Sequence, residues 1–324
     1  MLQPEDVGQR VVVRRIVGIR AGRPCFSDAL GELAELSESH LTLVTAQGRL
    51  SVPRSEIHRA RRVPPSRRPA AAAVAALEHA ADAAWPAPTR AQLGDWLLRS
   101  ADGWTGRANS ALPVGDPDRP LPAAIDAVQH WYADLGQPAL INTPLPLAAP
   151  ISAELDARGW RGGPPVLVQT APLAALLAAL PPARPDLADA PPVELTAAPS
   201  TDWLAVAANR KGDLPAAARQ VLTAVPQIRF AQVRVAGRLV AVGRGTVTGA
   251  GRWLGLSLIE VAPEARRRGL ARQVVRALAD WGTAVGATNA FLQVEQGNAE
   301  AVPLYRALGF TTHHTYRTRT APAG

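Results

Sequence analysis

The sequence predicts an α/β (α+β) chain in which a small N-terminal β module precedes two mixed α/β lobes. Three observations lead to this fold class. Residues 1–62 contain only short strand-like runs. From residue 70 onward, apolar strand-like runs alternate with stretches of helical periodicity. The order of elements in residues 70–180 then recurs in residues 193–324, at an offset of about 150 residues, which indicates an internal duplication.

The composition limits the classes of function that need to be considered. The chain has 324 residues and one cysteine, Cys25, so neither an internal disulfide nor a multi-cysteine metal site is expected. It contains no apolar run of 18 residues and no leader-like segment, so we expect a cytoplasmic protein without a membrane partner. Most of the formal charge of +8 lies in residues 1–68, which hold 12 arginines against 7 carboxylates. Phe26 is the only aromatic residue there, which argues against base stacking, so nucleic acid is not an expected partner.

Residues 1–62 predict a small SH3-like β-barrel. Four runs have the length and the β-branched content that are typical of strands, namely residues 11–17, 31–36, 41–45 and 49–52. Four or five short strands within about 60 residues favour a closed sheet. The arginine-rich stretch over residues 54–68 is interpreted as a solvated strand edge and exit, and residues 63–69 as a linker.

Residues 70–180 predict a degenerate copy of the C-terminal lobe. An alanine-rich helix over residues 70–84 precedes the alternating strands and helices. At the position where the second lobe has a glycine-containing loop, this lobe has the proline-rich segment 115–122. Its prolines have no N–H to donate, and Asp116 and Asp118 would repel a phosphate. We therefore expect this lobe to pack against the second one and to help wall a binding site.

A second proline-rich linker, residues 181–192, leads into the lobe of residues 193–324. That lobe is organised around one strand, turn and helix. The apolar run of residues 253–261 predicts a buried strand, and the following helix carries an apolar stripe of period 3.6. With Gly269 at the turn, unpaired N–H groups meet where the helix dipole is positive, and such a site binds phosphate.

The segment Arg266-x-x-Gly269-x-Ala271 resembles the pyrophosphate loop of the GNAT superfamily of N-acetyltransferases. A second GNAT-like signature follows it, Asn298-x-x-Ala301-x-x-Leu304-Tyr305-x-x-x-Gly309-Phe310. The resemblance implies acetyl-coenzyme A as the cosubstrate, without a metal. It also implies a set of residues that hold this cosubstrate: Ile259, Val261, Arg266, Arg267, Arg268, Gly269, Leu270, Ala271 and Asn298.

Catalytic roles are implied by the same resemblance. Tyr305 would protonate the departing thiolate, and a phenol within hydrogen-bond reach is suited to that task. The base that deprotonates the amine stays open between Glu260 on the central strand, Glu295 at the end of the next strand, and an ordered water chain. Asn298 is also expected to cap the last helix, unless Pro303 delays the start of that helix.

The whole arrangement resembles an actinobacterial family in which an SH3-like barrel precedes two GNAT lobes, the second of them active. Residues 101–110 resemble a stretch of that family. Its members are assigned as N-acetylglutamate synthases, which act in arginine biosynthesis, and as histone or protein acetyltransferases. Arginines beside strands are the candidate ligands for an acceptor that carries a carboxylate: Arg99, Arg107, Arg234 and Arg244.

Three functions therefore stand side by side after the sequence alone. The first is acetylation of the α-amine of an amino acid such as L-glutamate. The second is acetylation of a lysine in a basic protein tail, with the barrel as a docking module. The third is a non-catalytic acetyl-CoA sensor or a DNA-binding regulator.

Overall fold

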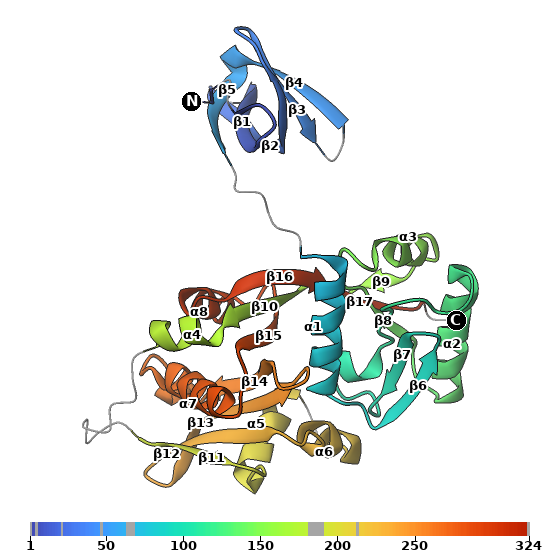
Figure 1. The fold of residues 1–324 in the computed structure, drawn as a ribbon, viewed down its shortest axis with the longest axis vertical. Coiled ribbons are helices and arrows are strands. Elements are labelled where there is room, and N and C mark those ends of the chain that lie inside the picture. The colour runs from blue at the N-terminus through green and yellow to red at the C-terminus, as the bar shows by residue number, and fades with distance from the viewer. Residues whose placement is uncertain are drawn as a thin grey trace. The chain divides into compact units, whose positions relative to one another are not determined.

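The computed structural model describes residues 2–3, 6–20, 22–45, 48–62, 69–180, 191–211 and 214–322. The chain divides into two compact units, Met1–Arg68 and Pro69–Gly324 (Figure 1). The predicted linkers at 63–69 and 181–192 fall mostly on residues outside this description, namely 63–68 and 181–190. Of the described helices, none has both the length and the apolar character that crossing a membrane requires.

The N-terminal unit is an antiparallel sheet whose described strands run in the order β4-β3-β2-β1-β5. Their bounds are β1 (Arg10–Arg20), β2 (Arg23–Leu36), β3 (His40–Thr45), β4 (Gly48–Pro53) and β5 (Ile57–Arg62). Alternate side chains point inward and form a small core of Val11, Val13, Leu33, Leu41, Leu43 and Val52.

The structure tests two expectations for this unit. β4 and β5 are the edges of the sheet, and no pairing joins them among the described residues. The predicted SH3-like barrel is therefore not confirmed as a closed sheet. The basic stretch that was interpreted as a solvated strand edge and exit contains the edge strand β5, which pairs with β1, so the strand-edge interpretation is confirmed. Ile57 and Ala60 are half-buried and pack against the core, whereas Arg59, Arg61 and Arg62 are exposed, so a run rich in arginine still forms a strand at the edge of the sheet.

The second unit is built on a mixed sheet whose described strands run in the order β11-β12-β13-β14-β15-β10-β16. Their bounds are β11 (Val193–Thr196), β12 (Ile228–Val235), β13 (Arg238–Thr248), β14 (Trp253–Val261), β15 (Asn289–Glu295), β10 (Val166–Pro172) and β16 (Thr311–Tyr316). Neighbouring strands are antiparallel except β14 and β15, which are parallel. A parallel pair needs a crossover connection, and here the connection contains helix α7 (Leu270–Ala284).

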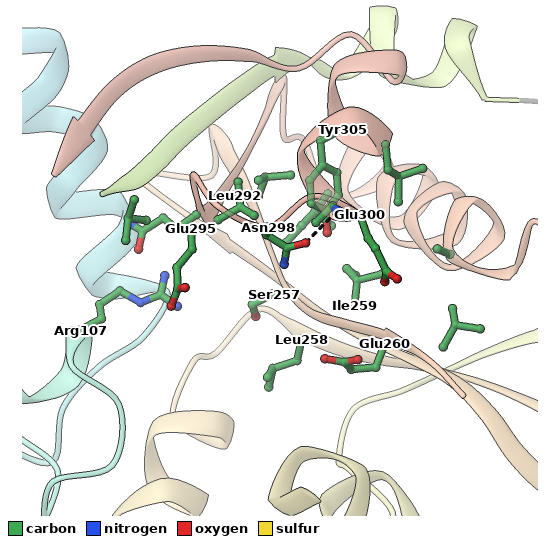
Figure 2. Close-up of a pocket in the computed structure, with 18 of the residues that line it drawn as sticks. Arg107, Ser257, Leu258, Ile259, Glu260, Leu292, Glu295, Asn298, Glu300 and Tyr305 are labelled. Atoms are coloured by element: carbon green, nitrogen blue, oxygen red, sulfur yellow. Dashed lines mark hydrogen bonds between the residues drawn. The ribbon is translucent and has the colours of Figure 1, made fainter. Parts of the chain in front are cut away.

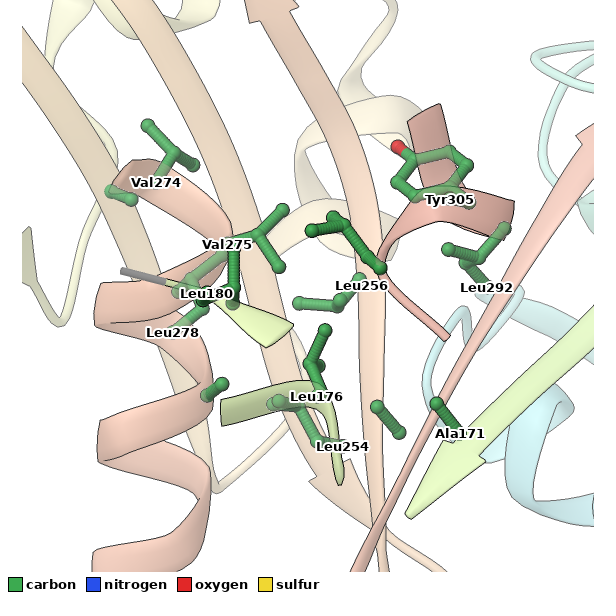
Figure 3. Packing of buried hydrophobic residues seen from close by; sticks show 14 of the residues in the cluster. Ala171, Leu176, Leu180, Leu254, Leu256, Val274, Val275, Leu278, Leu292 and Tyr305 are labelled. Carbon is green, nitrogen blue, oxygen red and sulfur yellow. The ribbon is translucent and has the colours of Figure 1, made fainter. Parts of the chain in front are cut away.

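The apolar stripe of α7 packs against this sheet. Leu270, Val274, Val275 and Leu278 are buried in one cluster with strand residues (Figure 3). Gly243 of β13 makes this contact close, because a Cβ at that position would stand 2.4 Å from Cγ1 of Val274. The helical stripe expected from the sequence is therefore confirmed.

The remaining described elements surround the sheet or build a smaller one. The helices are α1 (Ala71–Ala83), α2 (Leu121–Asp134), α3 (Ala149–Ala157), α4 (Leu173–Ala179), α5 (Thr201–Lys211), α6 (Ala216–Thr223) and α8 (Ala301–Ala307). The other strands are β6 (Thr89–Leu93), β7 (Trp96–Ser100), β8 (Leu140–Asn142), β9 (Arg161–Gly162) and β17 (Thr318–Thr320).

The two predicted lobes exchange a strand. β10 comes from the first of them, yet it lies between β15 and β16 and pairs antiparallel with both. β17 comes from the end of the chain, yet it lies between β8 and β9 in a small antiparallel sheet. Residues 69–324 consequently form one compact unit (Figure 1).

Candidate functional site

A cleft of about 1350 Å³ opens where β14 and β15 part (Figure 2). The two strands pair in parallel only from Trp253 and Asn289 as far as Leu256 and Leu292. Beyond that point β14 also carries a bulge, because its register with β13 shifts by one residue between Ser257 and Glu260. Leu258 has a positive φ of 53° at this bulge. The backbone of residues 257–261 is thereby turned away from β15 and lines the cleft.

The loop that leads into α7 forms one part of the cleft wall. A short 3-10 turn, Pro263–Ala265, follows β14, and Gly269 stands at the N-cap of α7 with φ 80°. No side chain caps this helix, so its first N–H groups and its positive dipole end remain available to an anion. A Cβ on Gly269 would meet no protein atom within 4 Å, which means that the space in front of it is open.

Most of the residues predicted to hold the cosubstrate line this cleft. They are Ile259, Val261, Arg266, Arg267, Gly269, Leu270, Ala271 and Asn298. Arg268 is exposed and does not line the cleft. Arg266 reaches across to helix α8, since its Nη1 lies 3.4 Å from Oε1 of Glu300. Arg267 has a positive φ of 63°, a strained conformation for a side chain of this size.

Helix α8 presents Tyr305 to the same cleft. The side-chain Oδ1 of Asn298 accepts a hydrogen bond from the N–H of Ala301 at 2.9 Å, which satisfies one donor of the first turn (Figure 2). Pro303 lies in that first turn, where no intrahelical N–H is needed, so the helix begins at Ala301. Tyr305 is 8% exposed, packs edge-to-face on Phe310 with ring centroids 5.7 Å apart, and lines the cleft.

Both carboxylates that were considered as the base lie at this cleft. Glu260 is half-buried on β14 and Glu295 is exposed at the end of β15 (Figure 2). The geometry therefore does not distinguish between these two carboxylates.

The opposite wall comes from residues far earlier in the chain. Trp85, Thr105, Gly106 and Arg107 line the cleft, as do Tyr316 and Thr318 near the C-terminus. Of these residues, only Arg107 was a candidate from the sequence. The resemblance of residues 101–110 to a family stretch was the one signal that could have drawn attention to the loop.

Asn109 holds that loop in place. Its Oδ1 accepts hydrogen bonds from the N–H groups of Ala101 (2.7 Å) and Gly103 (2.9 Å). Its Nδ2 donates to the carbonyl oxygens of Trp104 and Thr105, both at 2.8 Å. Asn109 is 2% exposed, so these bonds fix the loop from the inside and stabilise the positive φ of 64° at Thr105.

Aromatic stacking continues the same wall. Trp85 and Trp104 stack with ring centroids 5.4 Å apart, and Nε1 of Trp85 donates to Oγ1 of Thr105 at 3.1 Å. The guanidinium carbon of Arg107 lies 4.7 Å from the centroid of Trp85. Burial lowers the pKa of Arg107, and the nearby charge of Arg99 lowers it further.

Two predicted substrate ligands, Arg234 and Arg244, are not brought to the cleft. Arg234 lies outside it and pairs with Asp202 at 2.8 Å. Arg244 is 1% exposed and donates to backbone carbonyls, those of Leu222 at 2.9 Å and Ala84 at 3.0 Å. It therefore links the backbone segments at Leu222 and Ala84 and does not line the cleft. Burial, followed by the charge of Arg107, lowers the pKa of Arg244 to about 9.

Arg99, the remaining arginine candidate, is buried as well. Its Nη1 lies 3.1 Å from Oδ1 of Asp82, and its Nε donates to the carbonyl of Ser110. Arg99 is therefore a buried structural residue and does not line the cleft.

A family model described as "Probable histone acetyltransferase Rv0428c C-terminal" matches residues 71–319. The chain belongs to this acetyltransferase family. One relative in the family is the "Probable histone acetyltransferase Rv0428c" of Mycobacterium tuberculosis, 32% identical over 260 residues that cover 76% of this chain and 73% of the relative. The "Uncharacterized N-acetyltransferase YobR" of Bacillus subtilis is 44% identical over 75 residues, 22% of this chain and 30% of that protein.

The fold of the family is that of the GNAT N-acetyltransferases. A GCN5-related N-acetyltransferase from Kribbella flavida superposes with a TM-score of 0.59 at 17% identity, covering 78% of this chain and 96% of that protein. The GNAT resemblance found in the sequence is thus confirmed, and the chain is an N-acetyltransferase of the GNAT type.

Proposed function

We propose that this N-acetyltransferase transfers an acetyl group from acetyl-coenzyme A to a primary amine held in the cleft between β14 and β15. The observation that carries the proposal is the meeting of three features in one cleft. These are the uncapped start of α7 behind Gly269, the bulged end of β14 beyond its pairing with β15, and the hydroxyl-bearing Tyr305.

The loop before α7 suits a diphosphate. Free N–H groups at a helix start bind phosphate oxygens, and the open space in front of Gly269 allows close approach of such a group to the backbone. Arg266 and Arg267 add positive charge at the same edge of the cleft. Arg268 is dropped from the proposed set because it does not line the cleft.

Acetyl-coenzyme A, when bound, supplies the thioester whose acetyl group is transferred. The residues of this chain then handle two protons. Glu260 or Glu295 takes the proton that the amine loses, and the hydroxyl of Tyr305 holds a proton for the departing thiolate. A backbone N–H at the bulged end of β14 stabilises the negative charge that develops on the carbonyl oxygen.

For the acceptor we favour the α-amine of an amino acid such as L-glutamate, which would place the enzyme in arginine biosynthesis. The cleft is walled on both sides, and its far wall carries a cation at Arg107. Lysine in a basic protein tail is the second candidate, because the M. tuberculosis relative is named a probable histone acetyltransferase. The 12 arginines against 7 carboxylates in residues 1–68 would repel such a tail, which counts against a docking role for the N-terminal sheet.

The experiment is a thiol-release assay with purified full-length chain, acetyl-coenzyme A, a panel of amino acids and a set of basic peptides. We expect thiol release that depends on an amino acid and requires Tyr305. Release only with peptides would move the acceptor to protein lysine. Binding of acetyl-coenzyme A without turnover on any amine would overturn the proposed activity and favour a sensor.

A further inference from the structure

The far wall of the cleft contains a cation whose donors are not used by the protein. In the described part of the chain, the guanidinium of Arg107 makes no hydrogen bond and no ion pair, and it lies over the face of Trp85. Arginine has five N–H donors, and leaving them unused in a partly desolvated place costs free energy. A ligand that accepts hydrogen bonds from these donors would remove that cost.

A second guanidinium adds to the positive potential at this place. Arg244 lies over the same indole, with its guanidinium carbon 5.1 Å from the centroid of Trp85. Its hydrogen bonds go to neutral oxygens, and no carboxylate pairs with it within the described residues. The two guanidinium carbons thus lie 4.7 Å and 5.1 Å from the centroid of one indole, and burial followed by the like charge of Arg107 lowers the pKa of Arg244, so the two cations repel each other. A bound anion at the cleft side would relieve that repulsion.

The neighbouring carboxylates do not fill this role. Glu78 lies within electrostatic reach of Arg107, but its Oε1 is 2.6 Å from Nε2 of His314, and both of these side chains are buried. Glu295 lines the cleft near Arg107 in Figure 2, yet it forms no ion pair with it. Tyr316 is within electrostatic reach of both Arg107 and Glu295, which places an unpaired cation and an exposed carboxylate at the same end of the cleft.

We infer that Arg107, backed by Trp85, binds a carboxylate of the acceptor, so that the enzyme selects amines that carry an acidic group close to the reacting nitrogen. The inference rests on the proposed function and names the class of acceptor for that site. A guanidinium pairs with a carboxylate through two parallel N–H···O bonds, which the planar support of an indole leaves accessible at its edge. The complementary group, Glu295, faces the amine of the same small molecule.

Arg107 is a binding residue whose effect can be isolated with matched substrates. The acceptors are three amino acids and their decarboxylated counterparts: L-glutamate with γ-aminobutyrate, L-phenylalanine with phenethylamine, and L-lysine with cadaverine. Thiol release is measured for wild type, Arg107→Gln, Arg107→Lys and the control Arg234→Gln. The control removes an arginine that is paired with Asp202 away from the cleft.

We expect wild type and Arg234→Gln to prefer the amino acid to its decarboxylated counterpart by about 10-fold or more in kcat/KM. Arg107→Gln should lose about 10- to 100-fold on the amino acid, mainly through KM, and change little on the decarboxylated amine. Arg107→Lys should recover part of this loss because it keeps the charge but not the fork. Thermal unfolding of each variant shows that the loss is not one of folding.

The remaining outcomes contradict either the proposed function or the inference about Arg107. If acetyl-coenzyme A does not bind to wild type, the proposed function fails and the inference fails with it. If amines are acetylated but Arg107→Gln keeps the preference for the amino acid, the inference alone fails. It also fails if acetyl-coenzyme A binds and basic peptides, but none of the six small amines, are acetylated.

Discussion

Replacement of Gly269 by alanine tests the proposed diphosphate site most directly, because α7 offers a matched control at its other end. Gly269 precedes the helix with φ 80°, and Gly286 follows it with φ 98°. A Cβ at either position would meet no protein atom within 4 Å. Only Gly269 lines the cleft. The two substitutions therefore impose the same kind of backbone strain, and only one of them places a methyl group in the proposed binding space.

The magnitude follows from the backbone. A left-handed conformation costs a residue with a Cβ about 1 to 2 kcal/mol, so both variants should lose about this much free energy of unfolding. For a unit of this size, that corresponds to a fall in Tm of about 2–4 °C per kcal/mol. The two variants should differ in how much acetyl-coenzyme A stabilises them. At a concentration of 100 times the wild-type Kd, acetyl-coenzyme A should stabilise wild type and Gly286→Ala by about 2.7 kcal/mol. A tenfold weaker Kd in Gly269→Ala would reduce that gain to about 1.4 kcal/mol.

The assay is thermal unfolding of the three proteins with and without acetyl-coenzyme A, together with direct titration of the ligand. Equal ligand-induced stabilisation of Gly269→Ala and Gly286→Ala would refute the reasoning, because the methyl group would then not meet the diphosphate. A loss of folding in Gly269→Ala alone would also contradict it, since the space around both glycines is equally open.

Three further predictions concern the cleft wall and Tyr305, the proposed catalytic acid. Tyr305→Phe should lower kcat by about 100-fold or more with little change in the Kd of acetyl-coenzyme A. The control is Tyr132→Phe, which should keep the wild-type kcat because the hydroxyl of Tyr132 lies outside the cleft and donates to a backbone carbonyl at 2.7 Å. Equal kcat values in the two variants would remove Tyr305 from the mechanism. Asn109→Ala breaks four hydrogen bonds of the wall loop, so it should cost about 3 kcal/mol of stability and raise the acceptor KM. The control Asn289→Ala loses a single bond to a neighbouring hydroxyl and should leave KM as it is, so matching KM values in the two variants would contradict a positioning role. Burial raises the pKa of Tyr316 from 10.0 to about 12, so its contribution of about 3 kcal/mol is present below pH 10 and is lost as pH rises toward 12. The free energy of unfolding of wild type should therefore fall more between pH 10 and 12 than that of Tyr316→Phe, and parallel curves in denaturant titrations would show that the phenol is not buried in this way.

The local part of the site could be predicted from the sequence. The strand before α7, the turn at Gly269 and the apolar stripe of the helix are signals that lie within a few residues of one another. Local propensity and periodicity decide such a segment, so its prediction needs no knowledge of distant contacts. The same holds for Asn298 and the helix that starts three residues later.

The arginine ligands show where this reasoning stops. Arg107, Arg234 and Arg244 look alike in sequence, since each lies beside a strand. Their roles differ because Arg244 meets the carbonyl of Ala84, 160 residues away, and Arg234 meets Asp202. A long flexible side chain takes the partner that the tertiary fold offers, and no local pattern contains that information.

The order of the strands in the large sheet could not be predicted from the sequence either. The run that forms β10 has the apolar character of any buried strand, and nothing in it states that it inserts between β15 and β16. The wall residues Trp85 and Thr105 depend on this arrangement, because they reach the cleft only once the first lobe is attached to the large sheet.

That exchange of strands also determines when the protein can finish folding on the ribosome. β8 and β9 are separated by the place that β17 fills, and β17 is synthesised after both of them and after the whole of the second lobe's large-sheet strands. The large sheet likewise has to keep β10 unpaired until β15 and β16 emerge. Pairings of such long sequence separation form slowly. Neither sheet can be completed before strands of both lobes have been synthesised, and the nascent chain carries exposed strand edges until then.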